Sequence, residues 1–237
     1  MTDESLRVLS AGAAKAVVTA LAGTFNDARG IAATATFDAA GTIRTHLLVG
    51  DPCDVVVLPK PMLQVLADDG IVERASIATL GRVPTSIAVP DGAALPAIAD
   101  SASLRVTLER ASALHCPDLA RATAGIHFLR MLHDLGIHDR VASRIRAHPN
   151  GAAAMAAMAT AGDSAAVGCT QASEILYTPG VTLVGPLPEP FALATDYQAA
   201  VAAASDRVSA AREFCAMLGG SQSGILRRRS GFLSNAV

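Results

Sequence analysis

The 237-residue sequence has no tryptophan, and aromatic residues make up only 3% of it. Few rings are available for stacking, which weighs against sites for single-stranded nucleic acid or planar-ring ligands. A basic excess is also missing, because the formal net charge is -2 and the isoelectric point is about 6.3. We therefore expect no nucleic-acid partner. The basic run Arg227, Arg228 and Arg229 is interpreted as a solvated helix end that complements the helix dipole.

Metal-binding cysteine motifs and membrane-spanning runs are missing too. The four cysteines contain no Cys-x-x-Cys pair, so we expect no metal site and interpret them as buried thiols of a reducing compartment. No apolar run approaches the ~20 residues of a spanning helix, so no membrane insertion is expected. The polar, acidic start has no basic or apolar signal region. A cytoplasmic location is expected, or a periplasmic one if a signal was removed.

What the sequence has in excess is small and aliphatic residues. It is 51% hydrophobic with a mean hydropathy of +0.39, enough for a large core of Ala, Val, Leu and Ile. The length suggests one large domain or two small ones.

The opening stretch predicts a strand, a tight turn and a helix. Residues 6–9 are mostly apolar, Ser10 and Gly12 follow, and a helical pattern then runs to about residue 28. The backbone N–H groups of Gly12, Ala13 and Ala14 would lie at a helix N-terminus, where they can hold an anion.

Two further strand–helix units follow the first. Residues 31–37 predict a strand that ends at Asp38, and residues 54–58 predict a buried central strand followed by a helix with Pro61 near its start. Such alternation predicts a parallel sheet with right-handed crossovers. Ligands of open parallel sheets bind at the carboxyl ends of the strands, where these turns would gather.

Residues 77–90 form a long extended segment that is a plausible hinge into a second lobe. The later pattern predicts a helix that opens at residues 123–125 and an Ala-rich helix over 151–161, capped by Asn150 and ended by Gly162. We predict an α/β protein of two lobes, each a doubly wound, mostly parallel sheet, with the ligand in the cleft between them. The lobes are residues 1–80 with 197–237 and residues 81–196. The other expected elements are helices at 103–113 and 206–218, strands at 145–148, 165–169 and 181–186, and a return segment at 193–203.

Several short motifs, in their order, resemble the periplasmic-binding-protein fold of the molybdate-binding type. They are Val8-Leu9-Ser10-Ala11-Gly12-Ala13, Gly50-Asp51-Pro52-Cys53-Asp54-Val55-Val56-Val57, Thr123-Ala124-Gly125-Ile126 and the final Gly231-Phe232. Molybdate binders usually place hydroxyls in the second loop and a Tyr late in the second lobe. Here the second loop is Asp38-Ala39-Ala40-Gly41, and a carboxylate is a poor neighbour for a dianion.

A later segment is more similar to the branch of this fold that includes aconitate isomerase. It comprises Gln171-Ala172-Ser173-Glu174-Ile175-Leu176, Pro179-Gly180-Val181 and Val184-Gly185-Pro186-Leu187-Pro188. The resemblance implies an isomerase of a small unsaturated di- or tricarboxylate that moves a proton between allylic carbons, a scheme that needs no metal or organic cofactor. The alternative is a non-catalytic binder of a molybdate-like oxyanion or a small carboxylate. The oligomeric state stays open.

The candidate acid/base residues are His127, Glu174 and Lys15, each with a structural alternative. A helix N-terminus favours the neutral, basic form of His127, which could instead be a structural histidine. Glu174 could be the acid/base or support another group. Lys15 could clamp a carboxylate or lie on the surface. The histidines at 115, 133, 138 and 148 stand in polar stretches and are expected to be solvated.

The candidate ligand-binding residues lie in the predicted turns and at the crossover. Ser10 could bind ligand or cap a helix, Asp38 could act as a base or a helix cap, and Arg82 could bind a carboxylate or form a surface ion pair. The full set is Ser10, Gly12, Ala13, Asp38, Ala39, Gly41, Arg82, Thr123, Ala124, Gly125, Gln171 and Ser173.

Overall fold

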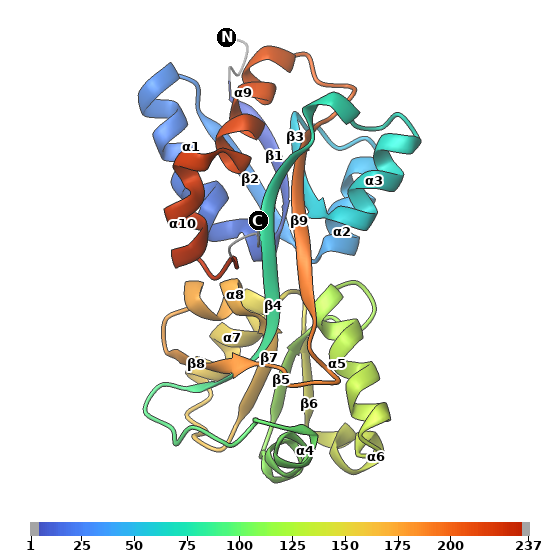
Figure 1. Ribbon diagram of the computed structural model, residues 1–237, viewed down its shortest axis with the longest axis vertical. Coiled ribbons are helices and arrows are strands. Elements are labelled where there is room, and N and C mark those ends of the chain that lie inside the picture. Colours follow the sequence, from blue (N-terminus) through green and yellow to red (C-terminus); the bar gives the residue numbers. More distant parts are fainter. Residues whose placement is uncertain (1–4, 234–237) are drawn as a thin grey trace. The chain divides into compact units, whose positions relative to one another are not determined.

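The computed structural model describes residues 5–233. It has two compact units (Figure 1): unit 1 comprises the chain up to Arg82 and from Thr195 onward, and unit 2 comprises Val83–Ala194. Each unit is a sheet with helices packed on it, so the predicted α/β class is confirmed.

Unit 1 holds the beginning and the end of the chain. Its elements are β1 (Leu6–Ala11), η1 (Gly12–Ala14), α1 (Lys15–Arg29), β2 (Ala33–Asp38), α2 (Ala40–Leu48), β3 (Val55–Pro59), α3 (Lys60–Asp68), η2 (Arg74–Ser76), the start of β4 (Ala78–Pro90), β9 (Ala194–Val201), α9 (Val208–Gly219), η4 (Ser221–Ser223) and α10 (Gly224–Arg229). The strand order is β2-β1-β3-β9-β4. β1 pairs in parallel with β2 and β3, and β9 runs antiparallel to β3. In Figure 1, α1, α9 and α10 lie on one side of this sheet, and α2 and α3 on the other.

Unit 2 is built the same way. The second part of β4 leads to α4 (Ser101–Arg110), β5 (Leu114–Pro117), α5 (Thr123–Asp134), α6 (His138–Val141), η3 (Ala142–Arg144), β6 (Ile145–His148), α7 (Gly151–Thr160), β7 (Val167–Gln171), α8 (Ala172–Tyr177) and β8 (Val181–Pro186). The strand order is β4-β7-β5-β6, with β8 paired to β4. The strands β7, β5 and β6 are parallel, and β4 is antiparallel to β7.

Local sequence features explain several of these elements. All five residues of β3 are buried, as expected for an apolar strand covered on both faces. The Asn150 side chain accepts a hydrogen bond from the Ala153 N–H at 2.9 Å, which confirms the predicted cap of α7. Gly162 follows α7 with a φ of +67°, a left-handed conformation that favours glycine.

The basic run forms the last turn of α10. Arg228 and Arg229 are exposed as predicted, but Arg227 is half-buried. Its guanidinium donates to the carbonyl oxygens of Leu218 at 2.7 Å and Gly220 at 2.9 Å, so it satisfies acceptors at the end of α9.

Within residues 5–233, no helix combines the length and apolarity that a membrane span requires.

A buried carboxylate ties unit 1 together at the start of β3. Asp54 is fully buried, and its oxygens accept from the Arg7 backbone N–H at 2.8 Å, from the Arg7 guanidinium at 2.9 Å, and from the Ser205 hydroxyl at 2.8 Å. Although burial opposes it, this set of donors holds the pKa of Asp54 below its ordinary value. The ionised carboxylate therefore connects β1, β3 and the segment after β9.

Two histidines of unit 2 overturn the expectation of solvated rings. His115 is only 7% exposed, and its Nδ1 lies 3.2 Å from Nε2 of the half-buried His148, with the rings stacked. Burial lowers the pKa of both rings, and the charge of Arg146 lowers that of His115 further, against an opposing effect of Asp163. The burial of His115 was not predicted because β5, with only four residues, carries no recognisable strand pattern.

We expect Asp54→Ala to lower the free energy of unfolding by about 3–5 kcal/mol, because the variant leaves Arg7 without its buried partner. The matched control is Asp68→Ala, which removes an exposed partner of Arg74 and should cost less than about 1 kcal/mol. Urea denaturation measures both. Equal effects in the two variants would contradict the role of Asp54.

Stability should fall as the pH drops through about 6.5, the ordinary pKa of histidine. Because both histidine pKa values are depressed in the folded protein, the unfolded chain takes up protons first, and protonation favours unfolding. Urea midpoints at about pH 7.5 and 5.5 test this across that pKa. The decrease should be smaller in His115→Asn, and an unchanged decrease would contradict the assignment.

Candidate functional site

Three strand ends gather at one edge of the unit 1 sheet. The parallel register pairs Ala11 with Asp38 and Ser10 with both Phe37 and Val57, so β1, β2 and β3 end together. No side chain in the described part of the chain caps η1, α1, α2 or α3. The first N–H groups of these helices are therefore suited to an external anion. We call this the unit 1 cluster: Ser10, Gly12, Ala13, Asp38, Ala39 and Gly41.

The polar side chains of this cluster have local partners. Ser10 is fully buried, and its hydroxyl donates to the Ala11 carbonyl oxygen at 3.0 Å. A carboxylate oxygen of Asp38 accepts from the Ala39 N–H at 2.7 Å, directly before α2. The Lys15 Nζ lies 5.6 Å from the centre of the Phe37 ring on the adjoining strand. The Lys15 side chain therefore lies near the end of β2, while its backbone N–H belongs to the first turn of α1.

Arg82 lies on β4 rather than at the strand ends of the unit 1 cluster. Its side chain is 52% exposed, with Nε 3.9 Å from an Asp196 carboxylate oxygen, and its backbone carbonyl accepts from the Leu233 N–H at 2.7 Å. The structure thus shows the ion pair that was the alternative interpretation of this residue.

The unit 2 cluster lies at the carboxyl ends of β5 and β7. α5 begins at Thr123, and its first turn packs closely on the chain after β5. A Cβ on Gly125 would lie 2.2 Å from the Asp118 carbonyl oxygen and 2.6 Å from that of Pro117, so only glycine allows this approach. We define the unit 2 cluster as Thr85, Thr123, Ala124, Gly125, Gln171 and Ser173.

Thr85 is a member of the cluster that sequence reasoning missed. It pairs with Gln171 across β4 and β7, and its side chain is fully buried. Within residues 5–233, the Thr85 and Ser173 hydroxyls have no hydrogen-bond partner. Buried hydroxyls are normally satisfied, so these two mark a place where ligand oxygens or ordered water complete the bonding. A threonine within a long strand pattern gives no signal of this in the sequence.

Glu174 is buried beneath the start of α7. A carboxylate oxygen of Glu174 accepts from the Thr170 hydroxyl at 2.6 Å. Burial raises the pKa of Glu174, while this hydroxyl and the backbone N–H groups of Gly151, Ala152 and Gln171 act in the opposite direction. The carboxylate thus holds α7, β7 and α8 together.

His127 lies in the first turn of α5 and is half-buried. Its Nε2 is 2.8 Å from the Phe191 carbonyl oxygen. Because a carbonyl oxygen only accepts, Nε2 carries the hydrogen, and in the neutral ring Nδ1 is the basic nitrogen. The structure therefore fixes the tautomer of this histidine.

The four cysteines are free and buried, and burial raises the pKa of Cys53, Cys116 and Cys215 to about 12. No group of three or more His, Cys, Asp or Glu side chains suited to a metal ion occurs among the described residues. The two clusters contain N–H donors, hydroxyls, one amide and the carboxylate of Asp38, with the Lys15 ammonium nearby.

In each of the two α/β units, helices begin at the carboxyl ends of parallel strands, an arrangement that suits the binding of small anionic solutes. Residues 6–233 match the model of the family described as bacterial extracellular solute-binding protein, and the chain belongs to this family. It is also 30% identical, over 215 residues, to an aconitate isomerase from Pseudomonas sp.. That match covers 88% of this chain and 79% of the relative.

Solved structures share the fold at lower identity. The periplasmic molybdate-binding protein of Azotobacter vinelandii is 18% identical, with a TM-score of 0.79 over 98% of this chain and 100% of that one. The sulfate-binding protein SubI from Mycobacterium tuberculosis is 19% identical, with a TM-score of 0.73 over 96% and 86%. These likenesses confirm the predicted periplasmic-binding-protein fold of the molybdate-binding type.

We expect Gly151→Ala to lower the free energy of unfolding by about 1–3 kcal/mol through overpacking. Its Cβ would lie 2.0 Å from the Glu174 carboxylate and 2.0 Å from the Thr170 hydroxyl. Gly23→Ala in α1 is the matched control: its Cβ meets nothing within 4 Å, and the change should stabilise by about 0.5–1 kcal/mol. Thermal unfolding that shows the same sign for both variants would contradict this packing.

Proposed function

We propose that this protein binds a small unsaturated tricarboxylate and isomerises it by a proton shift, as an aconitate isomerase does. The observation that carries the proposal is the 30% identity to such an enzyme over most of both chains. Trans-aconitate is the substrate to test first.

The ligand chemistry fits the donors of the two clusters. Carboxylates accept hydrogen bonds, and helix N-terminal N–H groups attract negative charge. In unit 1 these donors are the N–H groups around Gly12, Ala13 and Gly41. The Ser10 hydroxyl donates to the Ala11 carbonyl oxygen and would have to rotate to donate to a ligand. In unit 2 the donors come from Thr85, Thr123, Ala124, Gly125, Gln171 and Ser173. Lys15 is the candidate cation for one carboxylate, and Arg82 would have to leave its ion pair with Asp196 to serve as a second.

The reaction requires one base and one proton delivery. The base removes a proton from the methylene carbon next to a carboxylate, and the electron pair enters a dienolate-like system. Return of a proton to the other allylic carbon shifts the double bond, so the product has the same atoms and the same charge as the substrate. His127 is our candidate for this base through Nδ1, because Nε2 is engaged with the Phe191 carbonyl.

Glu174 acts as a positioning residue in this proposal. Its carboxylate already accepts from the Thr170 hydroxyl and from backbone N–H groups that include that of Gln171. We infer that it holds Gln171 and Ser173 in place for the ligand. Asp38, whose carboxylate already accepts from the Ala39 N–H, stays a candidate for a ligand-binding or basic role.

The second candidate function is non-catalytic binding of a carboxylate or a molybdate-like oxyanion. It is supported by membership of the solute-binding family and by the fold shared with molybdate-binding and sulfate-binding proteins. Here the N–H groups and hydroxyls would serve binding alone, and His127 would be structural. The cytoplasmic location expected from the sequence stays a prediction.

Incubation with trans-aconitate in deuterated water, followed by NMR, separates the two functions. The enzyme should produce cis-aconitate and incorporate deuterium at the exchanging carbon. Binding without either product would leave only the second function. Thermal shifts with trans-aconitate, succinate and molybdate then rank the ligands, and the carboxylates should stabilise more than molybdate.

Two variants assign the roles. His127→Asn should lower turnover by about 100-fold or more while ligand affinity changes little, as for loss of a general base. His133→Asn, an exposed change on the same helix, is its control.

Ser173→Ala should weaken trans-aconitate binding about tenfold without lowering stability, because its hydroxyl lacks a partner among residues 5–233. Ser112→Ala removes a hydroxyl that is bonded to Asp163 and should leave ligand affinity unchanged.

A further inference from the structure

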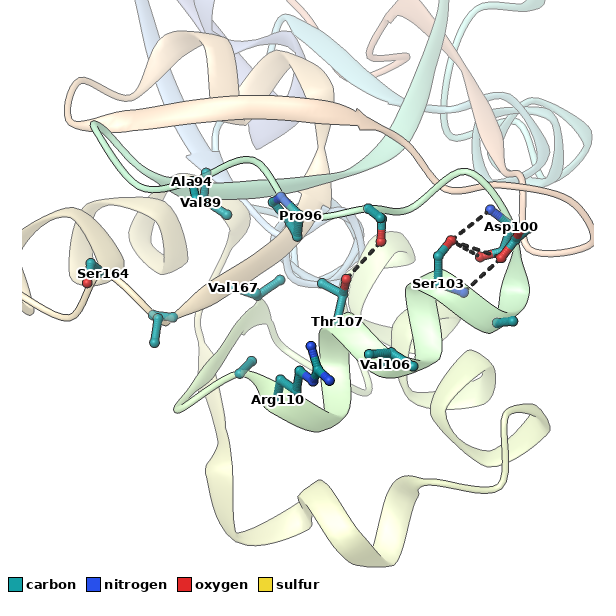
Figure 2. Close-up of a pocket in the computed structure, with 15 residues that line it drawn as sticks. Val89, Ala94, Pro96, Asp100, Ser103, Val106, Thr107, Arg110, Ser164 and Val167 are labelled. Carbon is teal, nitrogen blue, oxygen red and sulfur yellow. Dashed lines mark hydrogen bonds between the residues drawn. The ribbon is translucent and has the colours of Figure 1, made fainter.

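A pocket lies within unit 2, and none of the residues that line it belongs to the unit 2 cluster. It has a volume of about 670 Å³ and is formed by α4, the segment before α4 and the start of β7 (Figure 2). This volume falls within the usual range for small-molecule sites. Apolar side chains make up most of its wall, including Val89, Pro96, Val106 and Val167.

Most polar groups of the pocket are already occupied by local structure. A carboxylate oxygen of Asp100 accepts from the N–H and the hydroxyl of Ser103, which forms the cap of α4. The Thr107 hydroxyl donates to the Ala97 carbonyl oxygen at 2.8 Å, and these bonds are drawn in Figure 2. These groups shape the pocket rather than select a charged ligand.

Arg110 and Ser164 are the exceptions among the described residues, and Arg110 is the charged one of the two. It lines the pocket from the last turn of α4, and its guanidinium makes no hydrogen bond or ion pair with any residue of the described chain. In Figure 2 its side chain lies beside Thr107, on the side of α4 that faces Val167. The other arginine on α4, Arg105, pairs with Glu109. The pocket therefore combines one available cation with an apolar wall.

We propose that this pocket binds a medium-chain aliphatic monocarboxylate. The carboxylate pairs with Arg110 in a charge-assisted contact, and the chain lies along Val89, Pro96, Val106 and Val167. No aromatic side chain lines the pocket, so an aliphatic chain fits the wall better than a planar ring. Val106 is 44% exposed and Leu95, next to Pro96, is 65% exposed, so an alkyl chain would cover apolar surface that is now in water.

Calorimetric titration of the whole chain with sodium octanoate tests the proposal. We expect saturable binding of one octanoate per chain, and about tenfold weaker binding by Arg110→Gln. Arg105→Gln, which removes the same charge from the same helix outside the pocket, is the matched control and should bind like the native protein. Val106→Ser should weaken binding severalfold, and Ser173→Ala in the unit 2 cluster should not.

Three results would overturn the proposal. They are the absence of saturable octanoate binding, equal losses in Arg110→Gln and Arg105→Gln, and an unchanged affinity in Val106→Ser. Octanol, which has the same chain without the charge, should bind more weakly than octanoate, and equal binding would likewise refute the role of Arg110. Because no residue of this pocket belongs to either cluster, none of these outcomes depends on aconitate turnover.

Discussion

Parallel strand pairing is the constraint on which the rest of the structure depends. β1 pairs in parallel with β2 and β3 in unit 1, and β5 pairs in parallel with β6 and β7 in unit 2. Parallel strands end at the same edge of a sheet, so the helices that follow them start there as well. Each unit thereby collects N–H groups and small polar side chains at one edge without needing many charged residues. A chain with a mean hydropathy of +0.39 can in this way present an anion-binding surface and still bury a large aliphatic core.

One buried carboxyl group in each unit stabilises these strand ends through hydrogen bonds. Asp54 joins β1 and β3 to the returning chain through Arg7 and Ser205, and Glu174 joins α7 to the end of β7. Both accept several hydrogen bonds, which offset the cost of burying a carboxyl group. Glycine at 151 is what allows Glu174 to approach the helix so closely. In each unit the carboxylate therefore fixes backbone that leads to the proposed ligand donors.

The sequence predicted the elements that have a clear hydrophobic periodicity and clear turn or helix-capping residues. Residues 6–28 as a strand, turn and helix, the buried strand around residue 56, and the capped helix after Asn150 all correspond to observed elements. It failed where the signal depends on tertiary contacts. β5 is too short to show alternation, so His115 was wrongly expected to be solvated. The burial of the Thr85 hydroxyl and the N–H groups that Gly151 and Ala152 direct at Glu174 depend on residues distant in sequence, which no local pattern records.

A crystal structure of the protein with trans-aconitate tests the central claim most directly. The account predicts a ligand carboxylate oxygen within hydrogen-bond distance of the Ser173 hydroxyl, with His127 Nδ1 facing the methylene carbon. Density for the ligand with no carboxylate in contact with the unit 2 cluster would contradict it.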